Sequence, residues 1–560
     1  MEFGEIQKKI SDLYQDTRVS VAEYISLAHA LGDGSAGNVP SYIRTLKAAF
    51  LGSFTIQGLP EVCKARGIFH NLRIEIYLAA YNQFTQEAIN AESELARFNP
   101  DIVYAAVDAP EIMDRHHLEI VCRGLLEYTK AKIIFFNFAS SPQISPERAR
   151  ELNRALVDLE KKEERIIVFN FAKFLQRIGK DGHWYTKYKQ LGDMRLAPSG
   201  FAPLSEELIG YGVARAGNTK KCLVLDLDNT LWKGIIGEDG MRGIVPNRKF
   251  QRHILGLHEK GVILAINSKN NMRDAQEVFE HHPDMVLKEN HIAAWRVNWQ
   301  DKDRNMAEIA QDLDLGTDSF VFVDDSGFEQ ERVKTAFPEI AVLSPDALAD
   351  FRGFFSFKVT KEDMRRGAMY VEERKRKELR TSLPSEDEFL STLGLSLIIR
   401  HALESDVARV SQLTQKTNQF NLTTRRYTED EIRSRIQDNA WNIRVAEAKD
   451  RFGDYGAIGI AIIEHGRDAW RIDNFLLSCR ILGRKVEKVF LHALLDSACQ
   501  QGIERVIGEF IPSAKNKLCE SFLEDNKFVF ESCEEKKFIY HWTSENKSYT
   551  YPHFIKLTLA

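Results

Sequence analysis

Short apolar runs alternate with helical patterns along the first part of the chain. Helical periodicity over the first 45 residues is interrupted at the glycine-rich turn from Gly32 to Gly37. Apolar, β-branched or aromatic runs then predict strands at residues 46–54, 71–78, 101–107, 132–138 and 165–171. Because strands that alternate with helices form parallel sheets, the pattern predicts a helical segment over 1–45 and an α/β domain over 46–215.

The alternation of strands and helices resumes after a polar break near residues 214–220. It predicts a second α/β domain over 216–360, with strands at 222–227, 262–266, 285–287, 320–323 and 340–342. A charged helix from about residue 360 to 380 occupies most of a linker over 361–385. The last domain, over 386–560, has a mixed pattern, with strands expected at 395–400, 441–446, 457–463 and 470–476.

Composition and charge narrow the class of protein. The 560 residues are 44% hydrophobic and 28% charged, and the net charge of −5 does not suggest a nucleic-acid-binding protein. The N-terminus lacks the pattern of a secretory signal, and no apolar run is long enough to cross a membrane. The seven cysteines are scattered and form no CxxC pair, so neither disulfides nor structural zinc is indicated. We therefore expect a cytoplasmic protein without a nucleic acid or membrane partner.

Polar side chains stand at or after the strand ends of the central domain, where ligands bind in open α/β sheets. In chain order they are Asp226, Asp228, Ser268, Lys302, Asp324 and Asp325. The two carboxylates in LVLDLDNTLW are two positions apart, so alternation places both on one side of the strand's path. A nucleophile, a proton shuttle, metal ligands and a cation are the groups that phosphoryl transfer requires. The alternative is that two acidic turns and a lysine are simply solvated.

The order of these residues resembles the four motifs of the haloacid dehalogenase (HAD) superfamily. The resemblance implies that Asp226 attacks phosphorus and forms an aspartyl-phosphate. It implies that Asp228 protonates the leaving oxygen and later activates water. In this interpretation Lys302 offsets the negative charge of the nucleophile and the phosphate.

The same resemblance implies a Mg²⁺ site. Its ligands are the carboxylates of Asp226, Asp324 and Asp325 and the backbone carbonyl of Asp228. Further residues implied at the substrate are Thr230, Asn267, Ser268 and Lys269. About 40 residues separate the first motif from the second, and GIIGEDG between them reads as a short flap. We therefore expect a Rossmann-like HAD domain without a large cap, open to a bulky substrate or to another part of the chain.

Longer stretches resemble the FkbH-like branch, subclass IIIC, of this superfamily. They are LDLDNTLWKGIIGEDG, SKNN and VFVDDSGFEQERV, and in the last domain QLTQKTNQFNLTTRRY, DRFGDYGAIG, NFLLSCRILGRKVE and IPSAKNK. Members of this family include enzymes that take a glyceryl group from 1,3-bisphosphoglycerate, remove phosphate and deliver glyceryl to the phosphopantetheine thiol of an acyl carrier protein. The resemblance implies the same class of substrate and partner here.

The last domain also resembles an N-acetyltransferase (GNAT) fold. In that fold a strand leads into a glycine-containing turn and a helix, whose backbone N–H groups bind a pyrophosphate. Arg480, Gly483 and Arg484 lie at such a turn and are candidate substrate-binding residues. Lys485 replaces the small residue expected two positions after Gly483, which disfavours coenzyme A and suits a pantetheine arm better. The alternative for RILGRK is a plain helix start with a solvated basic face.

Cys479 is a candidate acyl-accepting nucleophile, because it lies beside Arg480 and near a predicted helix start. A single cysteine after an apolar run is more often only buried. Family members often have a cysteine immediately before the second-motif serine, where this chain has Asn267. If that cysteine is the acyl carrier in the glyceryl enzymes, this chain lacks it.

The first α/β domain loosely resembles an SGNH-hydrolase fold. Gly52 and Ser53 follow its first strand in the place of a nucleophile turn. The pair Asp181 and His183 has the wrong spacing for the remaining catalytic groups, so we interpret Ser53 as a turn residue.

Four functions remain open from the sequence. The preferred one is a two-step enzyme that removes phosphate from a small phosphorylated acid and loads the acyl group onto an acyl carrier protein. The second is a phosphatase with non-catalytic flanking domains. The third is a fused acetyltransferase that uses coenzyme A on an amine, and the fourth is a scaffold with inactive domains.

Overall fold

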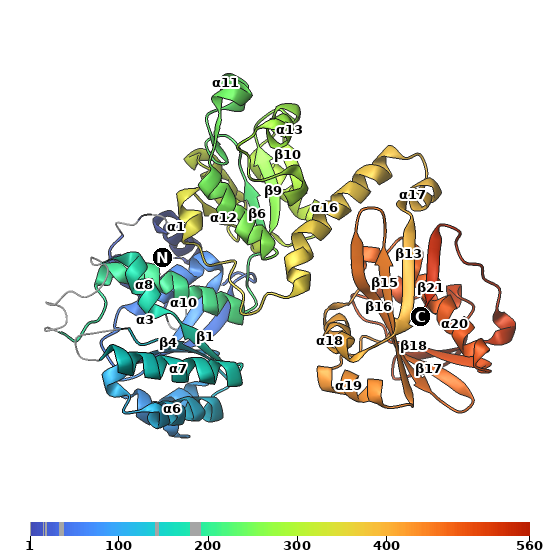
Figure 1. Ribbon diagram of the computed structural model, residues 1–560, viewed down its shortest axis with the longest axis horizontal. Helices are drawn as coiled ribbons and strands as arrows, with labels where there is room; N and C mark the ends of the chain where they lie inside the picture. Colours follow the sequence, from blue (N-terminus) through green and yellow to red (C-terminus); the bar gives the residue numbers. More distant parts are fainter. Residues whose placement is uncertain (1, 15, 17–18, 33–38, 140–144, 180–191) are drawn as a thin grey trace. The chain divides into compact units, whose positions relative to one another are not determined.

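A computed structural model of the chain describes residues 2–14, 16, 19–32, 39–139, 145–179 and 192–560. They form two compact units, Met1–Val371 and Glu372–Ala560 (Figure 1). The first unit contains two parallel sheets, and the second contains a larger mixed sheet. The predicted α/β class with parallel sheets is confirmed.

The first sheet has the strand order β2-β1-β3-β4-β5, with all neighbours parallel. Its strands are β1 (Arg44–Gly52), β2 (Leu72–Leu78), β3 (Ile102–Ala106), β4 (Lys132–Phe136) and β5 (Ile166–Phe169). Helices α3 (Leu59–Gly67) and α10 (Phe201–Arg215) cover one face, and α6 (Arg115–Tyr128) and α7 (Pro146–Lys162) cover the other (Figure 1). The remaining helices are α1 (Phe3–Leu13), α2 (Val21–Ala30), α4 (Phe84–Ile89), α5 (Glu94–Phe98) and α8 (Phe171–Ile178). The five predicted strands all form, because alternate residues of each are buried against the two helical layers.

The central sheet has the order β10-β9-β6-β11-β12, again all parallel, so β6 is its middle strand. Its strands are β6 (Cys222–Leu225), β9 (Ile263–Ser268), β10 (Ile292–Val297), β11 (Phe320–Val323) and β12 (Ala341–Leu343). Helices α12 (Arg248–Glu259) and α13 (Met272–His281) pack on one face, and α14 (Lys302–Leu313) and α15 (Gly327–Ala336) pack on the other.

A short insertion follows β6. It consists of the two-stranded β7 (Trp232–Lys233) and β8 (Val245–Pro246) and the helix α11 (Ile236–Gly243) between them. All residues from β6 to β9 are described, and no further domain lies among them. The expectation of a flap without a large cap is confirmed.

One predicted strand of this domain is wrong. The backbone N–H groups of Val286 and Leu287 donate to the side-chain oxygen Oε1 of Gln251, at 2.9 and 3.0 Å, and so take no part in a sheet. The run Met285–Leu287 is apolar because Met285 and Leu287 are buried in the core, where the local backbone is satisfied by a side chain. The strand in this region is β10 at Ile292–Val297, which the sequence pattern missed.

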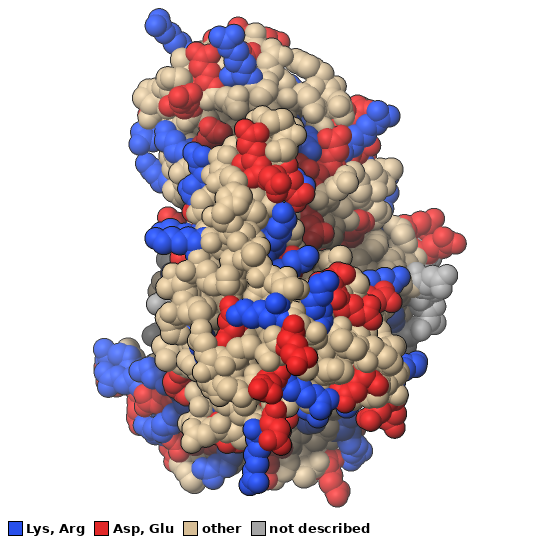
Figure 2. Space-filling model, turned by 90° about the vertical axis from the view of Figure 1, so that its right-hand side faces the viewer, with Lys and Arg blue, Asp and Glu red and all other residues tan. Residues whose placement is uncertain are grey.

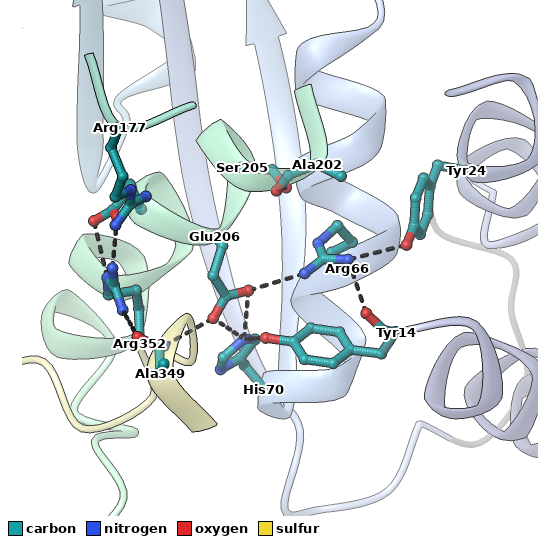
Figure 3. Close-up of polar contacts among 11 residues, drawn as sticks. Tyr14, Tyr24, Arg66, His70, Arg177, Ala202, Ser205, Glu206, Ala349 and Arg352 are labelled. Carbon is teal, nitrogen blue, oxygen red and sulfur yellow. Dashed lines mark hydrogen bonds and ion pairs between the residues drawn. The ribbon is translucent and has the colours of Figure 1, made fainter. Parts of the chain in front are cut away.

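A buried polar network ties the two sheets of the first unit together (Figure 3). The carboxylate of Glu206, on α10, forms ion pairs with two side chains. One is with the guanidinium of Arg66, at 3.3 Å, and the other is with the ring nitrogen Nε2 of His70, at 3.1 Å. The carboxylate also accepts the hydroxyl of Tyr14 and, at 2.8 Å, the backbone N–H of Arg352, which follows the central sheet. The ring of His70 stacks on Phe351 with a centroid separation of 5.0 Å. The first sheet and the central sheet therefore share one continuous core.

Helix α16 (Lys361–Ser382) runs from the first unit into the second. Within the second unit, the guanidinium of Arg376 makes a bidentate pair with Asp450, at 2.7 and 2.9 Å, and lies over the ring of Tyr455. The hydroxyl of Tyr455 donates to the same carboxylate at 2.7 Å. These contacts fix the last turns of α16 on the second unit.

The sheet of the second unit has the order β19-β20-β18-β17-β16-β15-β13-β21, with β14 paired to β17. Its strands are β13 (Leu395–His401), β14 (Phe420–Asn421), β15 (Trp441–Lys449), β16 (Asp454–His465), β17 (Ala469–Leu477), β18 (Arg505–Phe510), β19 (Val529–Glu534), β20 (Lys537–Thr543) and β21 (Ile555–Leu559). Its helices are α17 (Glu386–Leu393), α18 (Val407–Lys416), α19 (Glu429–Gln437), α20 (Val486–Gln500) and α21 (Phe522–Asp525). Helices α18 and α19 pack on one face and α20 on the other (Figure 1). Most neighbours are antiparallel, but β17 and β18, and likewise β13 and β21, are parallel.

Among the described residues, no helix combines the length and the apolar composition that a membrane crossing requires.

Candidate active site

The candidate site lies at the carboxyl end of β6, the middle strand of the central sheet. Asp226 follows β6 directly, and its backbone N–H donates to the carbonyl of Val323, which ends β11. Lys302 is the first residue of α14, and its ammonium lies 2.7 Å from Asp226 Oδ1 and 2.5 Å from Asp324 Oδ2. All three side chains are buried. The structure thus brings together one cation and two carboxylates that are distant in the sequence.

Burial is the largest single influence on the pKa of each of these groups. Burial, together with the nearby charge of Asp324, raises the pKa of Asp226 to about 6, against the opposing effect of Lys302. Burial alone lowers the pKa of Lys302, but the carboxylates of Asp226 and Asp324 outweigh it, so the net pKa is raised. The pKa of Asp325 is raised by burial and by Asp324.

Asp226, Asp324 and Asp325 form the group of side chains that is placed to hold a metal ion. One carboxylate oxygen from each lies within 4.8 Å of the others. Three carboxylate oxygens suit a hard divalent cation such as Mg²⁺, which prefers oxygen ligands. The side chain of Asp228 is not in this group.

The carboxylate of Asp228 is instead held by three donors. Trp232 Nε1 and the backbone N–H of Ile236 donate to Oδ1 at 2.8 and 3.1 Å, and Asn270 Nδ2 donates to Oδ2 at 2.9 Å. Trp232 and Ile236 belong to the flap, whereas Asn270 follows β9. The carboxylate is therefore fixed in one orientation beside Asp226, as a proton-transferring group requires.

The other predicted central residues divide into two groups. Ser268 and Thr230 are buried at the site, and the hydroxyl of Ser268 is a hydrogen-bond partner of both Asn270 and Asp226. The side-chain amide of Asn267 donates to the carbonyl of Lys302 at 2.9 Å, and its oxygen accepts from Asn305 at 3.1 Å. Asn267 therefore positions the start of α14.

Three side chains at this site were missed by the sequence reasoning. They are Trp232, Asn270 and Glu329. Glu329 pairs with Lys269, at 2.8 Å between Nζ and Oε1. Trp232 lies in the stretch LDLDNTLW and Asn270 in SKNN. Their closeness in sequence to the motif residues could therefore have identified them as site residues.

The turn before α20 contains a buried arginine and precedes an acidic side chain. Arg484 is buried, and its guanidinium pairs with Glu373 at 3.0 Å and donates to the carbonyl of Arg480 at 2.6 Å. Lys485 has a left-handed backbone with φ of 60° at the N-cap of α20. Glu487 places a carboxylate in the first turn of this helix, and burial raises its pKa.

Of the other candidate residues of this turn, Cys479 and Gly483 are exposed and Arg480 is partly exposed. Cys479 is exposed, which removes the alternative that it is a buried apolar residue. Arg480 Nε donates to Ser478 Oγ at 3.2 Å. Gly483 has a φ of 76°, and open space surrounds the position of an added Cβ.

Ser53 lies at the carboxyl end of β1 and is buried. Its hydroxyl accepts the backbone N–H of Asp108 at 2.7 Å, and the Asp108 carboxylate pairs with Arg195 at 3.0 Å. Ser53 therefore links the ends of β1 and β3 by a turn contact. The pair Asp181 and His183 lies outside the described residues.

On the face shown in Figure 2, Lys and Arg side chains are interspersed with Asp and Glu side chains, without a broad area of one sign. This face does not have the continuous positive surface of a nucleic-acid-binding protein.

No family model matches the chain, and no curated protein matches it. Among solved structures, the chain is similar to the N-terminal part of the protein BF1531 from Bacteroides fragilis, which contains a phosphatase domain complexed with Mg. The identity is 26% and the TM-score 0.52, over 61% of this chain and 100% of that one. Matches with lower scores include the ribosomal-protein-S18-alanine N-acetyltransferase from Escherichia coli (13% identity, TM-score 0.22, 26% of this chain and 93% of that one). Another is a Salmonella typhimurium acetyl transferase that modifies the N-terminal serine of ribosomal protein L7/L12 (19%, 0.23, 28% and 96%). Two features of the present chain therefore bear on its function: the central site and the likeness to a phosphatase domain complexed with Mg.

Proposed function

We propose that the chain is a Mg²⁺-dependent phosphotransferase of the HAD type, coupled to transfer of an acyl group, glyceryl in the first instance, to an acyl carrier protein. The observation that carries the proposal is the contact of Lys302 with both Asp226 and Asp324, beside a third carboxylate from Asp325. The likeness to a phosphatase domain complexed with Mg supports it.

The contacts support the following catalytic roles. A carboxylate oxygen of Asp226 forms a bond to phosphorus while the bond from phosphorus to the leaving oxygen breaks. Asp228, fixed by Trp232, Ile236 and Asn270, gives a proton to the leaving oxygen and then takes one from the water that hydrolyses the aspartyl-phosphate. The ammonium of Lys302 offsets negative charge near the nucleophile throughout.

Asp226, Asp324, Asp325 and the backbone carbonyl of Asp228 would hold the Mg²⁺. The fit rests on the three convergent carboxylates, which are the oxygen donors that this ion prefers. When bound, Mg²⁺ supplies positive charge to the transferring phosphoryl group.

We assign the flanking parts to an SGNH-hydrolase-like domain and a GNAT-like domain, over the ranges expected from the sequence. The acyl acceptor proposed for the C-terminal part is the phosphopantetheine thiol of a carrier protein, with Cys479 as the candidate intermediate nucleophile. Exposure of Cys479 supports this role, since an acyl-accepting thiol must reach its partner.

Coenzyme A is a poorer fit than a pantetheine arm. A pyrophosphate at the start of α20 would face the carboxylate of Glu487, and the guanidinium of Arg484 is already paired with Glu373. A pantetheine arm lacks the nucleotide and the pyrophosphate of coenzyme A, so no pyrophosphate has to be placed at the start of α20. Because the same contacts count against bound coenzyme A, they also favour the second candidate function. This is a phosphatase of small phosphate esters whose flanking domains are not catalytic.

Intact-mass spectrometry tests the coupled reaction. A phosphopantetheinylated carrier protein is incubated with the enzyme, Mg²⁺ and 1,3-bisphosphoglycerate, and Asp226→Asn and Cys479→Ala are run in parallel. A glyceryl mass gain that both variants lose supports the proposal. Phosphate release that depends on Asp226, without any mass gain on the carrier, leaves the phosphatase alone. If coenzyme A accepts the acyl group in place of the carrier protein, the argument from Glu487 against coenzyme A is wrong.

A further inference from the structure

The start of α14 has no side-chain cap. Lys302 is the first residue of this helix, and Asp301 is its N-cap residue. The carboxylate of Asp301 accepts no hydrogen bond from the described first turn of α14, and it pairs instead with Arg332 at 2.5 Å. A helix start without a cap is weakly held, because the first four N–H groups have no partner inside the helix. The ammonium of Lys302 nevertheless contacts two buried carboxylates, so its placement depends on another anchor.

Three side-chain amides supply this anchor. Asn267, on β9, donates from Nδ2 to the backbone carbonyl of Lys302 at 2.9 Å. Asn305, one turn into α14, donates from Nδ2 to the side-chain oxygens of Asn267, at 3.1 Å, and Asn298, at 3.0 Å. Asn298 Nδ2 donates in return to Asn305 Oδ1 at 3.1 Å. Asn267 and Asn305 are fully buried, and the three amides therefore form one hydrogen-bonded network behind the lysine.

The network joins three segments that meet at the site. Asn267 immediately precedes Ser268, which ends β9. Asn298 directly follows β10, and its backbone N–H donates to the carbonyl of Ser268 at 3.1 Å. Asn305 belongs to α14. Since a buried polar network with its hydrogen bonds made is rigid, a shift of α14 relative to β9 would break several of these bonds together.

We propose that Asn298 and Asn305 are positioning residues for the phosphoryl transfer, and that they act through Lys302. Together with Asn267 they hold the first turn of α14 where the ammonium reaches both buried carboxylates. The rate of a catalysed reaction depends steeply on such geometry, and a misplacement of about 1 Å can cost about 100-fold. This inference rests on the proposed phosphotransferase function.

The test is a double-mutant cycle on the hydrolysis of p-nitrophenyl phosphate in Mg²⁺. Asn305→Ala should lower kcat about 10- to 100-fold and change KM less than about threefold, because the network orients a group that acts in the transition state. In the Lys302→Met background the same substitution should lower the remaining kcat less than about threefold, since the ammonium that it positions is absent. Lys302→Met is assayed at high enzyme concentration so that its residual hydrolysis is measurable. Equal losses in the two backgrounds would overturn the proposal, because Asn305 would then act independently of Lys302.

Asn218→Ala is the matched control. Asn218 is buried in the same unit, and its amide donates to the backbone carbonyls of His70 and Asn71 at 2.7 and 3.1 Å. This variant should lose stability in urea unfolding but keep kcat within about twofold of the wild type. A loss of kcat as large as that of Asn305→Ala would mean that any buried amide has the same effect, which contradicts a positioning role.

Asn298→Ala removes the reciprocal partner of Asn305 and serves if Asn305→Ala does not fold. Its loss of kcat should be smaller, because Asn267 keeps its donor, and should likewise disappear in the Lys302→Met background. Hydrolysis by the wild-type chain separates two kinds of failure. If the wild type hydrolyses the ester but the losses are equal in both backgrounds, only the positioning role is wrong. If the wild type does not hydrolyse it, the proposed function fails and the positioning role fails with it.

Discussion

The ammonium of Lys302 lies 2.7 Å from Asp226 and so neutralises the side chain that is proposed to attack phosphorus. The same ammonium lies 2.5 Å from Asp324. One buried cation therefore compensates two buried carboxylates, and the three side chains act as a single electrostatic unit. Variants at these positions test chemistry and stability separately.

Asp226→Asn removes the proposed nucleophile while keeping its size. We expect a loss of at least about 1,000-fold in kcat for p-nitrophenyl phosphate, since covalent catalysis has no substitute at this position. Steady-state assays in Mg²⁺ measure it, and thermal unfolding checks that the variant is folded. Activity within tenfold of the wild type contradicts the assignment of Asp226.

Lys302→Met leaves Asp226 and Asp324 facing each other without a cation. In EDTA the free energy of unfolding should fall by about 3–5 kcal/mol, the usual cost of removing one partner from a buried pair. Mg²⁺ should recover part of the loss, because it binds only the folded site. Urea unfolding with and without Mg²⁺ measures both effects. Lys8→Met, which breaks the exposed pair with Glu331, is the control and should change little. Equal stability of Lys302→Met and the wild type would disprove the electrostatic unit.

Asn270→Ala removes one of the three donors that orient Asp228. A misplaced general acid matters most when the leaving oxygen is a poor leaving group. We expect kcat to fall about 10- to 100-fold for an alkyl phosphate, and much less for p-nitrophenyl phosphate, whose leaving group departs without a proton. Equal losses on the two substrates would indicate general damage to the site and not a positioning role.

Glu206→Gln tests the network that joins the two sheets of the first unit. Burial alone raises the pKa of Glu206, but His70, Arg66 and Tyr14 outweigh it and hold the pKa well below its ordinary value of 4.5. A carboxyl whose pKa is lower in the folded state stabilises the fold above pH 4.5 and loses that contribution as the pH falls further.

The variant should therefore be less stable than the wild type by about 3–5 kcal/mol at pH 7, with the gap constant to about pH 5 and smaller below pH 4.5. Urea unfolding at four pH values between 7 and 4 measures the gap. Glu207→Gln, whose carboxylate pairs with Arg177 and Arg352 nearer the surface, is the matched control. A gap that widens in acid contradicts the sign of this prediction.

Lys220 gives a second pH dependence, in the alkaline range. Its ammonium donates to the backbone carbonyls of Asp318 and Glu339, and burial lowers its pKa to about 8, despite the opposing charges of the same two residues. Between pH 8 and 10.5 the unfolded chain retains the proton and the folded chain does not, so stability rises with pH. The stability of the wild type relative to Lys220→Met should increase by about 2 kcal/mol from pH 7.5 to 10. A flat or falling difference would show that Lys220 stays charged when folded.

Burial on both faces produced apolar runs that predicted most strand positions, although the buried strand Ile292–Val297 was missed. The strands at Arg44–Gly52 and Phe320–Val323 are examples of correctly predicted strands. The prediction failed at Met285–Leu287, because Gln251, more than thirty positions away, satisfies the backbone there. No local pattern carries that information.

The candidate site shows the same division. The positions of Asp226 and Asp324 at strand ends follow from the sequence pattern, since parallel strands align their carboxyl ends. The burial of Arg484 against Glu373 could not be predicted, because it depends on a residue 111 positions earlier. That Glu329 Oε2 has no hydrogen-bond donor among the described residues is likewise a property of three-dimensional packing.

The continuous core of the first unit also bears on how such a gene can change by recombination. Phe3, Leu208, Leu223 and Phe351 belong to one apolar cluster, although the two parallel sheets look like separate domains in the sequence. A crossover between residues 215 and 220 would replace half of that cluster with side chains that were never selected together. We expect natural gene fusions and domain exchanges in proteins of this architecture to avoid that point. The two sheets should therefore be exchanged together, as one unit.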